Sequence, residues 1–369
     1  MSDDQNAPGR YRIPLSDTGV HVRLAVIGAI ILAIAGSFAY VAGWLSPNLL
    51  TQARVIDRFE QVDGVHAGFR RNHAKGVCVT GTFESNGEGE RLSRAALFRP
   101  GRVPVVGRFS LGGGHPQMPD GPMAVLAMAL SFRPADGEEW RTAMIDLPIF
   151  IVKDVHGFYD QLLASKPNPA TGQPDPARMA TFAAAHPEIV RAMQVIKSRP
   201  SPSGFADASY NSLNAFLFVN SVGATRAVRW SMVASEPFVP ATAEQGKSSD
   251  KNYLFDNVIA RLARGPVQWH LIVTIGQPDD MTNDPTLAWP SDRERVDVGT
   301  LTVNRAESEA PGNCRDVVFD PLILPWGIEP SDDPMLSARS ASYAESFRRR
   351  EGERKTPSAI QVPANHKGS

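Results

Sequence analysis

Uncharged and mostly apolar residues fill positions 24–45, whereas polar and apolar residues alternate at short intervals through the rest of the chain. A helix of 22 residues is long enough to cross the hydrocarbon core of a bilayer. Tyr40 and Trp44 lie near its distal end, where amphipathic rings favour the membrane interface. The pattern therefore predicts one transmembrane helix at 24–45.

Arginines precede the apolar run, at Arg10, Arg12 and Arg23. Cationic flanks tend to stay in the cytoplasm, so we expect a cytoplasmic segment at 1–23 and a periplasmic or otherwise extracytoplasmic main domain. The run is longer than the apolar core of a secretory signal, and the residues after it make a poor processing site. We therefore favour an uncleaved signal anchor, with a cleaved signal peptide as the alternative.

β-branched residues and partial two-residue alternation predict strands along most of the remaining chain. The predicted strands are 76–84, 104–111, 123–132, 142–152, 215–222, 226–233, 268–275 and 298–303. Apolar residues at helical spacing predict helices at 48–60, 176–198 and 253–264, and the polar segment 351–369 is expected to be a flexible tail. The fold class is α+β, an antiparallel barrel or sandwich with helical insertions, and a mixed sheet without barrel closure fits the pattern equally well.

The composition limits the classes of function. Hydrophobic residues make up 42% of the 369 residues, enough for a sizeable core, and the net charge of −1 gives no bias toward nucleic acid. The only cysteines are Cys78 and Cys314, which lack the spacing of a metal site. We expect two buried thiols, and a disulfide is the alternative in an oxidising compartment.

The most informative chemistry lies near the C-terminus, in the segment 335–343. Arg339 precedes Tyr343 by four residues on a predicted helix, so both side chains project from one face. A nearby guanidinium favours the ionised form of a phenol, whose ordinary pKa is about 10, and a phenolate can hold ferric haem. With Phe319-Asp320-Pro321 upstream, the segment resembles the proximal haem segment of the haem catalase family.

This resemblance implies a catalase-type antiparallel β-barrel over 48–350 and a haem b cofactor whose iron is bound by Tyr343. Arg350 lies seven residues after Tyr343, about two helical turns along, so it can reach the same cofactor. By the resemblance, Arg70, Arg108 and Arg350 correspond to the arginines that pair with the haem propionates.

A second resemblance to the same family lies at residues 70–76, which read RRNHAKG. It implies that His73 is the distal acid/base, since an imidazole can take a proton from one peroxide oxygen and return it to the other. The segment 105–110 is similar to the family segment that carries a propionate arginine, here Arg108, and a serine hydrogen-bonded to the distal histidine, here Ser110.

The resemblance continues at residues 148–154 and then departs from the family. Phe150 and Phe158 correspond to phenylalanines near the haem plane, although core packing explains them nearly as well. Typical catalases place an asparagine where this chain has Ile145, and an apolar side chain cannot orient a second peroxide molecule. Asp146 is adjacent, but on a strand it faces the other way.

Few residues remain beyond Arg350, whereas typical catalases continue further. The short chain and Ile145 together point to the small catalase-related peroxidase subgroup, also called minimal catalases. The sequence therefore predicts a membrane-anchored haem peroxidase that reduces hydrogen peroxide and organic hydroperoxides with small organic electron donors, in oxidative-stress defence and with weak catalase activity. Two alternatives stay open: a non-catalytic haem-binding or haem-sensing protein, and an enzyme that rearranges fatty-acid hydroperoxides. A homodimer is compatible with the sequence.

Overall fold

The computed structural model describes residues 17–41, 44–45 and 50–363. The chain divides between Thr51 and Gln52 into two compact units, which are treated separately below. The arginines at positions 10 and 12, on which the expected membrane topology partly rests, lie outside the described residues.

The described residues of the first unit form one helix, α1 (Asp17–Val41). Its segment Thr18–Val41 is apolar enough and, at about 36 Å, long enough to cross a bilayer, and none of it is buried. The helix starts seven residues before the predicted boundary at Leu24 and, in its described part, ends at Val41, so Trp44 and Leu45 follow it as bends. A signal sequence near an N-terminus can also meet these criteria of length and hydropathy.

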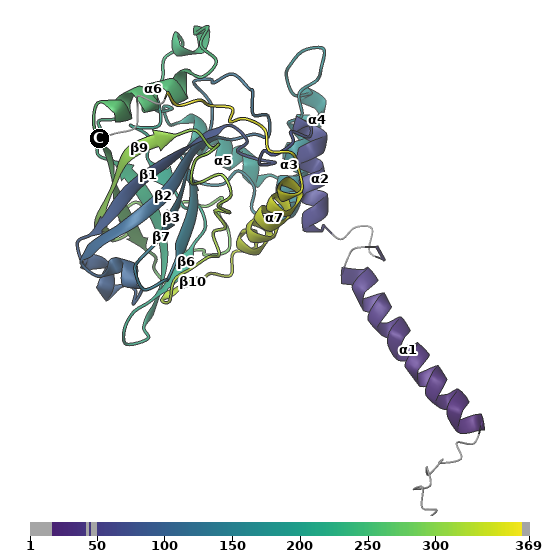
Figure 1. The fold of residues 1–369 in the computed structure, drawn as a ribbon. Coiled ribbons are helices and arrows are strands. Elements are labelled where there is room, and N and C mark those ends of the chain that lie inside the picture. The colour runs from purple at the N-terminus through teal and green to yellow at the C-terminus, as the bar shows by residue number, and fades with distance from the viewer. Residues whose placement is uncertain (1–16, 42–43, 46–49, 364–369) are drawn as a thin grey trace, which may run out of the picture. The chain divides into compact units, whose positions relative to one another are not determined.

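The second unit is built on a sheet of ten strands, all paired antiparallel (Figure 1). The strands are β1 (Gly76–Ser85), β2 (Gly101–Leu111), β3 (Leu126–Phe132), β4 (Trp140–Ile145), β5 (Tyr210–Asn211), β6 (Phe216–Val219), β7 (Thr225–Ala234), β8 (Val267–Ile275), β9 (Arg295–Glu307) and β10 (Ile328–Pro330). Pairing of β7 with β8 closes the order β7-β5-β4-β3-β2-β1-β9-β8 into an eight-stranded barrel, and β6 and β10 extend from β7. Closure removes the exposed strand edges of an open sheet.

Helices and irregular segments connect and flank the strands of this unit. The helices are α2 (Gln52–Asp63), α3 (Val155–Ala164), α4 (Pro176–Ala185), α5 (Glu188–Lys197), α6 (Tyr253–Ala263) and α7 (Pro334–Glu351), with short 3₁₀ turns at Glu88–Arg91, Ala96–Phe98 and Gln245–Lys247. Helices α2, α3 and α7 contact one another and lie together beside the barrel (Figure 1).

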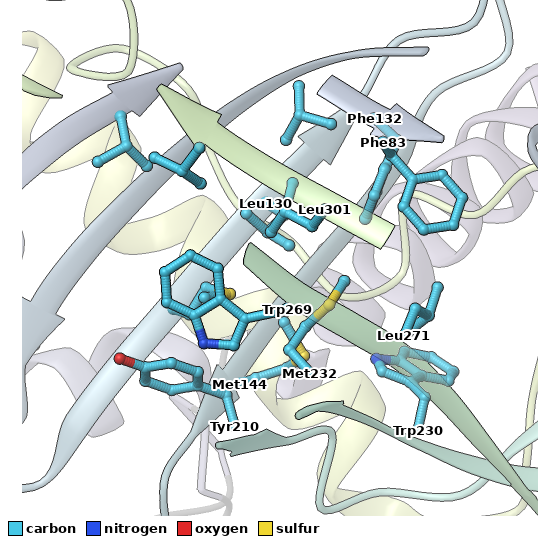
Figure 2. Close-up of a cluster of buried hydrophobic side chains, with 14 of the residues drawn as sticks. Phe83, Leu130, Phe132, Met144, Tyr210, Trp230, Met232, Trp269, Leu271 and Leu301 are labelled. Carbon is cyan, nitrogen blue, oxygen red and sulfur yellow. The ribbon is translucent and has the colours of Figure 1, made fainter. Parts of the chain in front are cut away.

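Aromatic and long aliphatic side chains fill the barrel interior (Figure 2). They alternate along the strands with residues that face outward, as the pleat of a strand requires. In β2, for example, the Phe109 ring lies inside the barrel, 5.8 Å from the Trp269 ring, whereas Arg108 and Ser110 lie on the opposite face. Burying one such ring stabilises the fold by about 1.5–3 kcal/mol.

The two-residue and helical patterns locate most elements correctly, and the barrel is confirmed over the open sheet. Two of the predicted segments differ from expectation. The predicted strand 142–152 ends at Ile145, and the predicted helix 176–198 is broken at His186 and Pro187 into α4 and α5. Helix α3 and the short strands β5 and β10 were not predicted.

Two predictions about the rest of the chain are wrong. Cys78 and Cys314 form a disulfide instead of two buried thiols. The segment after α7 is not a loose tail in its described part, because Ile360 is 1% exposed within the core and the Val362 backbone N–H donates to Ser308 Oγ at 2.8 Å.

Candidate functional site

A cavity of about 410 Å³ lies between the outer face of strands β2–β4 and helices α2, α3 and α7. All nine site residues predicted from the sequence line it, and they come from strand β2, helices α3 and α7, and two loops: Arg70, His73, Arg108, Ser110, Phe150, Phe158, Arg339, Tyr343 and Arg350. A cavity of this size is in the range of small-molecule and cofactor sites.

Small side chains on the strands make room for the cavity. The outward positions of β3 and β4 that face it carry Ala127, Ala129 and Ala143, while the alternate Met144 packs in the barrel core (Figure 2). Ile145 also lines the cavity, as expected. The neighbouring Asp146 does not, because its carboxylate turns away and accepts the Leu126 backbone N–H at 3.0 Å.

His73 lies in a tight loop just before β1. Its backbone has a positive φ of 54°, a conformation that costs energy for a residue with a side chain. Asn72 holds the turn, since its side-chain oxygen accepts the backbone N–H groups of His73 and Gly113, both at 2.9 Å. The turn directs the imidazole into the cavity with Nδ1 3.4 Å from Ser110 Oγ.

The environment of His73 keeps its imidazole neutral. Burial, followed by the charges of Arg108 and Arg339, lowers the pKa of His73 from 6.5 to about 3. A neutral imidazole can accept a proton at neutral pH, which a charged one cannot.

Three arginines meet at one edge of the cavity around a single buried carboxylate. Arg70 Nη1 and Arg108 Nε donate to Glu309 Oε1 at 2.8 and 2.7 Å. Arg350 Nη1 donates to the Arg315 carbonyl at 2.9 Å, while its buried Nε has no hydrogen-bond partner in the described part of the chain. This edge therefore carries two positive charges more than its carboxylate neutralises.

The pKa values at this edge reflect the excess of positive charge. Burial, followed by the charges of Arg108 and Arg350, holds the pKa of Arg70 well below its usual range. Burial, with Arg108 next, lowers the pKa of Arg350 to about 10. Burial alone would raise the pKa of Glu309, but the charges of Arg108 and Arg70 outweigh it and lower that pKa, so the carboxylate stays ionised.

Tyr343 and Arg339 lie on α7, which starts cleanly because the Asp333 carboxylate accepts the Met335 backbone N–H at 2.9 Å and Pro334 follows the cap. The Tyr343 side chain lines the cavity, and among the described residues its hydroxyl has no hydrogen-bond partner. Arg339 donates to Asn214 Oδ1 and, at 2.9 Å, to the Ala143 carbonyl. Its guanidinium therefore binds these two oxygens and not the phenol.

Phenylalanines form an apolar wall of the cavity. The rings of Phe150 and Phe158 lie 6.0 Å apart, and Phe158 is 5.7 Å from Phe59 of α2. Val55 and Ile56 of the same helix also line this side.

These groups fit a haem that carries two propionates. The arginine edge has two positive charges without a carboxylate partner, and buried carboxylates need such partners. The phenol oxygen is free to bind a metal, and phenolate is a known haem ligand. The apolar walls suit a flat, mostly hydrocarbon ring.

Sequence reasoning missed two residues that organise the site. Glu309 follows β9 in a loop without a recognised motif, and its role is evident only from its ion pairs with Arg70 and Arg108. Asn214 lies at 0% exposure, between Arg339 and the Asp333 carboxylate, to which its Nδ2 donates at 2.7 Å. A buried asparagine beside a helix cap is visible only in three dimensions.

The fold is that of the catalases. A solved fungal catalase superposes with a TM-score of 0.71 at 21% identity, and a bacterial catalase with a TM-score of 0.69 at 22% identity. Each comparison covers 86% of this chain, and the chain spans 66% and 64% of those two proteins.

Sequence comparison gives the family. The family model described as Catalase matches residues 37–367, so the chain belongs to the catalase family. It is 38% identical over 301 residues to a catalase-related peroxidase of Synechococcus elongatus, which covers 82% of this chain and 89% of that relative. A catalase-related peroxidase of Mycolicibacterium paratuberculosis is 35% identical over 306 residues, 82% of this chain and 96% of the relative. The chain falls in the catalase-related peroxidase subgroup, and membership of the family implies that it binds haem.

Proposed function

We propose that this chain is a haem b peroxidase that reduces hydrogen peroxide and organic hydroperoxides with small organic electron donors. One observation carries the proposal: a phenol, a neutral imidazole and an excess of two buried guanidinium charges line the same cavity. The names of the two relatives described above support a reaction on peroxide.

In this proposal the haem is held by charge, by a ligand and by packing. Tyr343 would bind the iron, the propionates would pair with Arg70, Arg108 and Arg350, and the phenylalanine wall would pack against the ring. When bound, haem supplies the two-electron reduction of the peroxide O–O bond and then accepts electrons singly from donors.

His73 moves the proton in the proposed reaction. If Nδ1–H donates to Ser110 Oγ, then Nε2 keeps its lone pair for the proton of the hydroperoxide. The imidazole then returns that proton to the departing oxygen, which leaves as water from hydrogen peroxide or as an alcohol from an organic hydroperoxide. Because the pKa of His73 is lowered, the imidazole holds this proton only briefly.

Ile145 favours peroxidase turnover over dismutation. Dismutation uses a second peroxide molecule as reductant, and that molecule needs a hydrogen-bond donor to hold it. Position 145 offers a hydrocarbon side chain to the cavity. Loss of such a donor lowers rates by about 100- to 1000-fold, so catalase activity is expected to be weak.

We further propose that α1 anchors the protein in a membrane, with the barrel on the extracytoplasmic side. The length and hydropathy of the helix, which has no buried residue in its apolar window, support this. The disulfide supports it as well, since such bonds persist in oxidising compartments.

The test uses the full-length chain, purified in detergent and supplied with haem. We expect a phenolate-type ferric absorption spectrum that Tyr343→Phe changes. We expect His73→Ala to retain haem and to lower peroxide cleavage by about 100- to 10,000-fold. His156→Ala is the matched control, because His156 is exposed on α3 and lies outside the cavity.

Equal peroxide turnover by the His73→Ala and His156→Ala proteins would remove His73 from the reaction. A wild-type protein that binds haem through Tyr343 but turns over no peroxide with any organic donor would instead be a haem carrier or sensor.

A further inference from the structure

The segment 308–317, which follows β9, accepts hydrogen bonds from Arg70, Arg108 and Arg350, and it is called the clamp segment below. Glu309 of this segment accepts from Arg70 and Arg108, as described above, and Arg108 Nη2 also lies 3.3 Å from Glu309 Oε2. The carboxylate therefore joins arginines from two different parts of the chain.

Backbone carbonyls of the clamp segment add further contacts. Arg70 Nη2 lies 3.0 Å from the carbonyl oxygens of Cys314 and Val317 and 3.3 Å from that of Arg315. The Arg315 carbonyl also accepts Arg350 Nη1. All three arginines that face the cavity edge thus take their orientation from ten consecutive residues.

The clamp segment contains no helix or strand, so another feature must fix its position. The Cys78–Cys314 disulfide ties it to β1, and both cysteines are 0% exposed. Cys78 lies directly opposite Arg108 in the β1–β2 ladder, so the bridge fixes the clamp segment to the strand pair that carries one of its arginines. The cluster around the bridge also includes the Tyr343 ring.

We propose that the disulfide-tethered clamp segment is the device that positions the three arginines and retains the haem, an inference that rests on the haem binding proposed above. Reduction of the bridge adds two electrons and two protons and gives two thiols. A phosphine reductant such as tris(2-carboxyethyl)phosphine supplies the two electrons and becomes the phosphine oxide, and water supplies its oxygen and the two protons. The clamp segment then loses its covalent attachment to β1, and the arginines lose their fixed geometry.

The competing explanation is that the bridge only stabilises the fold. Removal of a disulfide and removal of a large core side chain destabilise proteins by comparable amounts. A purely structural bridge would therefore affect haem retention no more than a core truncation of equal cost.

The experiment measures haem dissociation from the full-length protein in detergent by transfer to excess apomyoglobin. We expect Cys78→Ala/Cys314→Ala to release haem about tenfold faster, the effect of losing one charge-assisted hydrogen bond. Leu262→Ala is the matched control, because Leu262 is buried on α6 and lies outside the cavity. It should lower the melting temperature similarly and leave the dissociation rate within about twofold.

Reduced wild-type protein, with its two thiols confirmed by titration, provides the same measurement without a substitution. It should release haem about as fast as the double variant, and reoxidation should restore slow release. If the reduced protein releases haem within about twofold of the rate of the oxidised protein, the disulfide does not retain haem through the clamp segment. The proposed binding of haem would be unaffected by that result. A wild-type protein that takes up no haem refutes the proposed function itself.

Discussion

The lowered pKa of His73 makes a quantitative prediction about the effect of pH on peroxide cleavage. An ordinary imidazole with a pKa of 6.5 is about 3% neutral at pH 5, so a reaction that needs the neutral base would be about 25-fold slower at pH 5 than at pH 7. With a pKa of about 3, His73 is almost entirely neutral at both values. Bound propionates would offset the charge of Arg108, but burial is the largest cause of the shift and remains.

The assay is kcat/KM for hydrogen peroxide between pH 4 and 8 with the haem-loaded full-length protein. We expect the values at pH 5 and pH 7 to agree within about twofold. His73→Gln serves as the reference, because it removes the titrating group. An acid limb with a midpoint near pH 6.5 that is present in the wild type and absent from His73→Gln would refute the reasoning.

Three substitutions test other parts of the structure. Glu309→Gln should lower the free energy of unfolding of the haem-free protein by about 3–5 kcal/mol in chemical denaturation, because the buried Arg108 and the half-buried Arg70 lose their carboxylate partner. Glu294→Gln, at an exposed ion pair, should lower it by less than about 1 kcal/mol. Ile145→Asn should raise oxygen evolution from hydrogen peroxide by about tenfold or more relative to donor oxidation, and an unchanged ratio would mean that this side chain does not limit dismutation. Gly81→Ala places a Cβ against the backbone of β9 and should lower the free energy of unfolding by about 1–3 kcal/mol, seen as a lower melting temperature. Gly121→Ala places its Cβ where no atom lies within 4 Å and should leave the melting temperature unchanged.

The individual strands of the barrel were predictable where the sequence of a strand shows alternation or an excess of β-branched residues. Alternation in 268–275 and β-branched residues in 76–84 locate β8 and β1, because one face of each strand packs in a core. Closure was not predictable from these patterns. It depends on the pairing of β7 with β8 and on the two-residue strand β5, which has no signal of its own.

The site divides in a similar way between residues that motifs locate and residues that only the fold brings together. Tyr343 and His73 occur in segments whose spacing or resemblance identifies them. The partners of the arginines could not be found, since Glu309 is 239 residues from Arg70 in the sequence and bonds it only after the barrel has formed. The disulfide was judged wrongly for the same reason: cysteines separated by 236 residues give no indication that their strand and loop adjoin.

The disulfide and the apolar helix provide independent arguments about the side of the membrane on which the barrel lies. Cysteines in the cytoplasm are kept reduced, so a bridge that is fully buried and joins the clamp segment to the barrel is expected where the compartment is oxidising. Arg10, Arg12 and Arg23, at and before the start of the apolar run, favour a cytoplasmic N-terminus, and an uncleaved helix would then put the second unit on the other side of the membrane. The two arguments use different residues and different chemistry, and both support the proposed extracytoplasmic position of the barrel. If the clamp segment retains haem as proposed, then a barrel kept on the reducing side would lose its cofactor faster, and export would be a condition for a stably loaded enzyme.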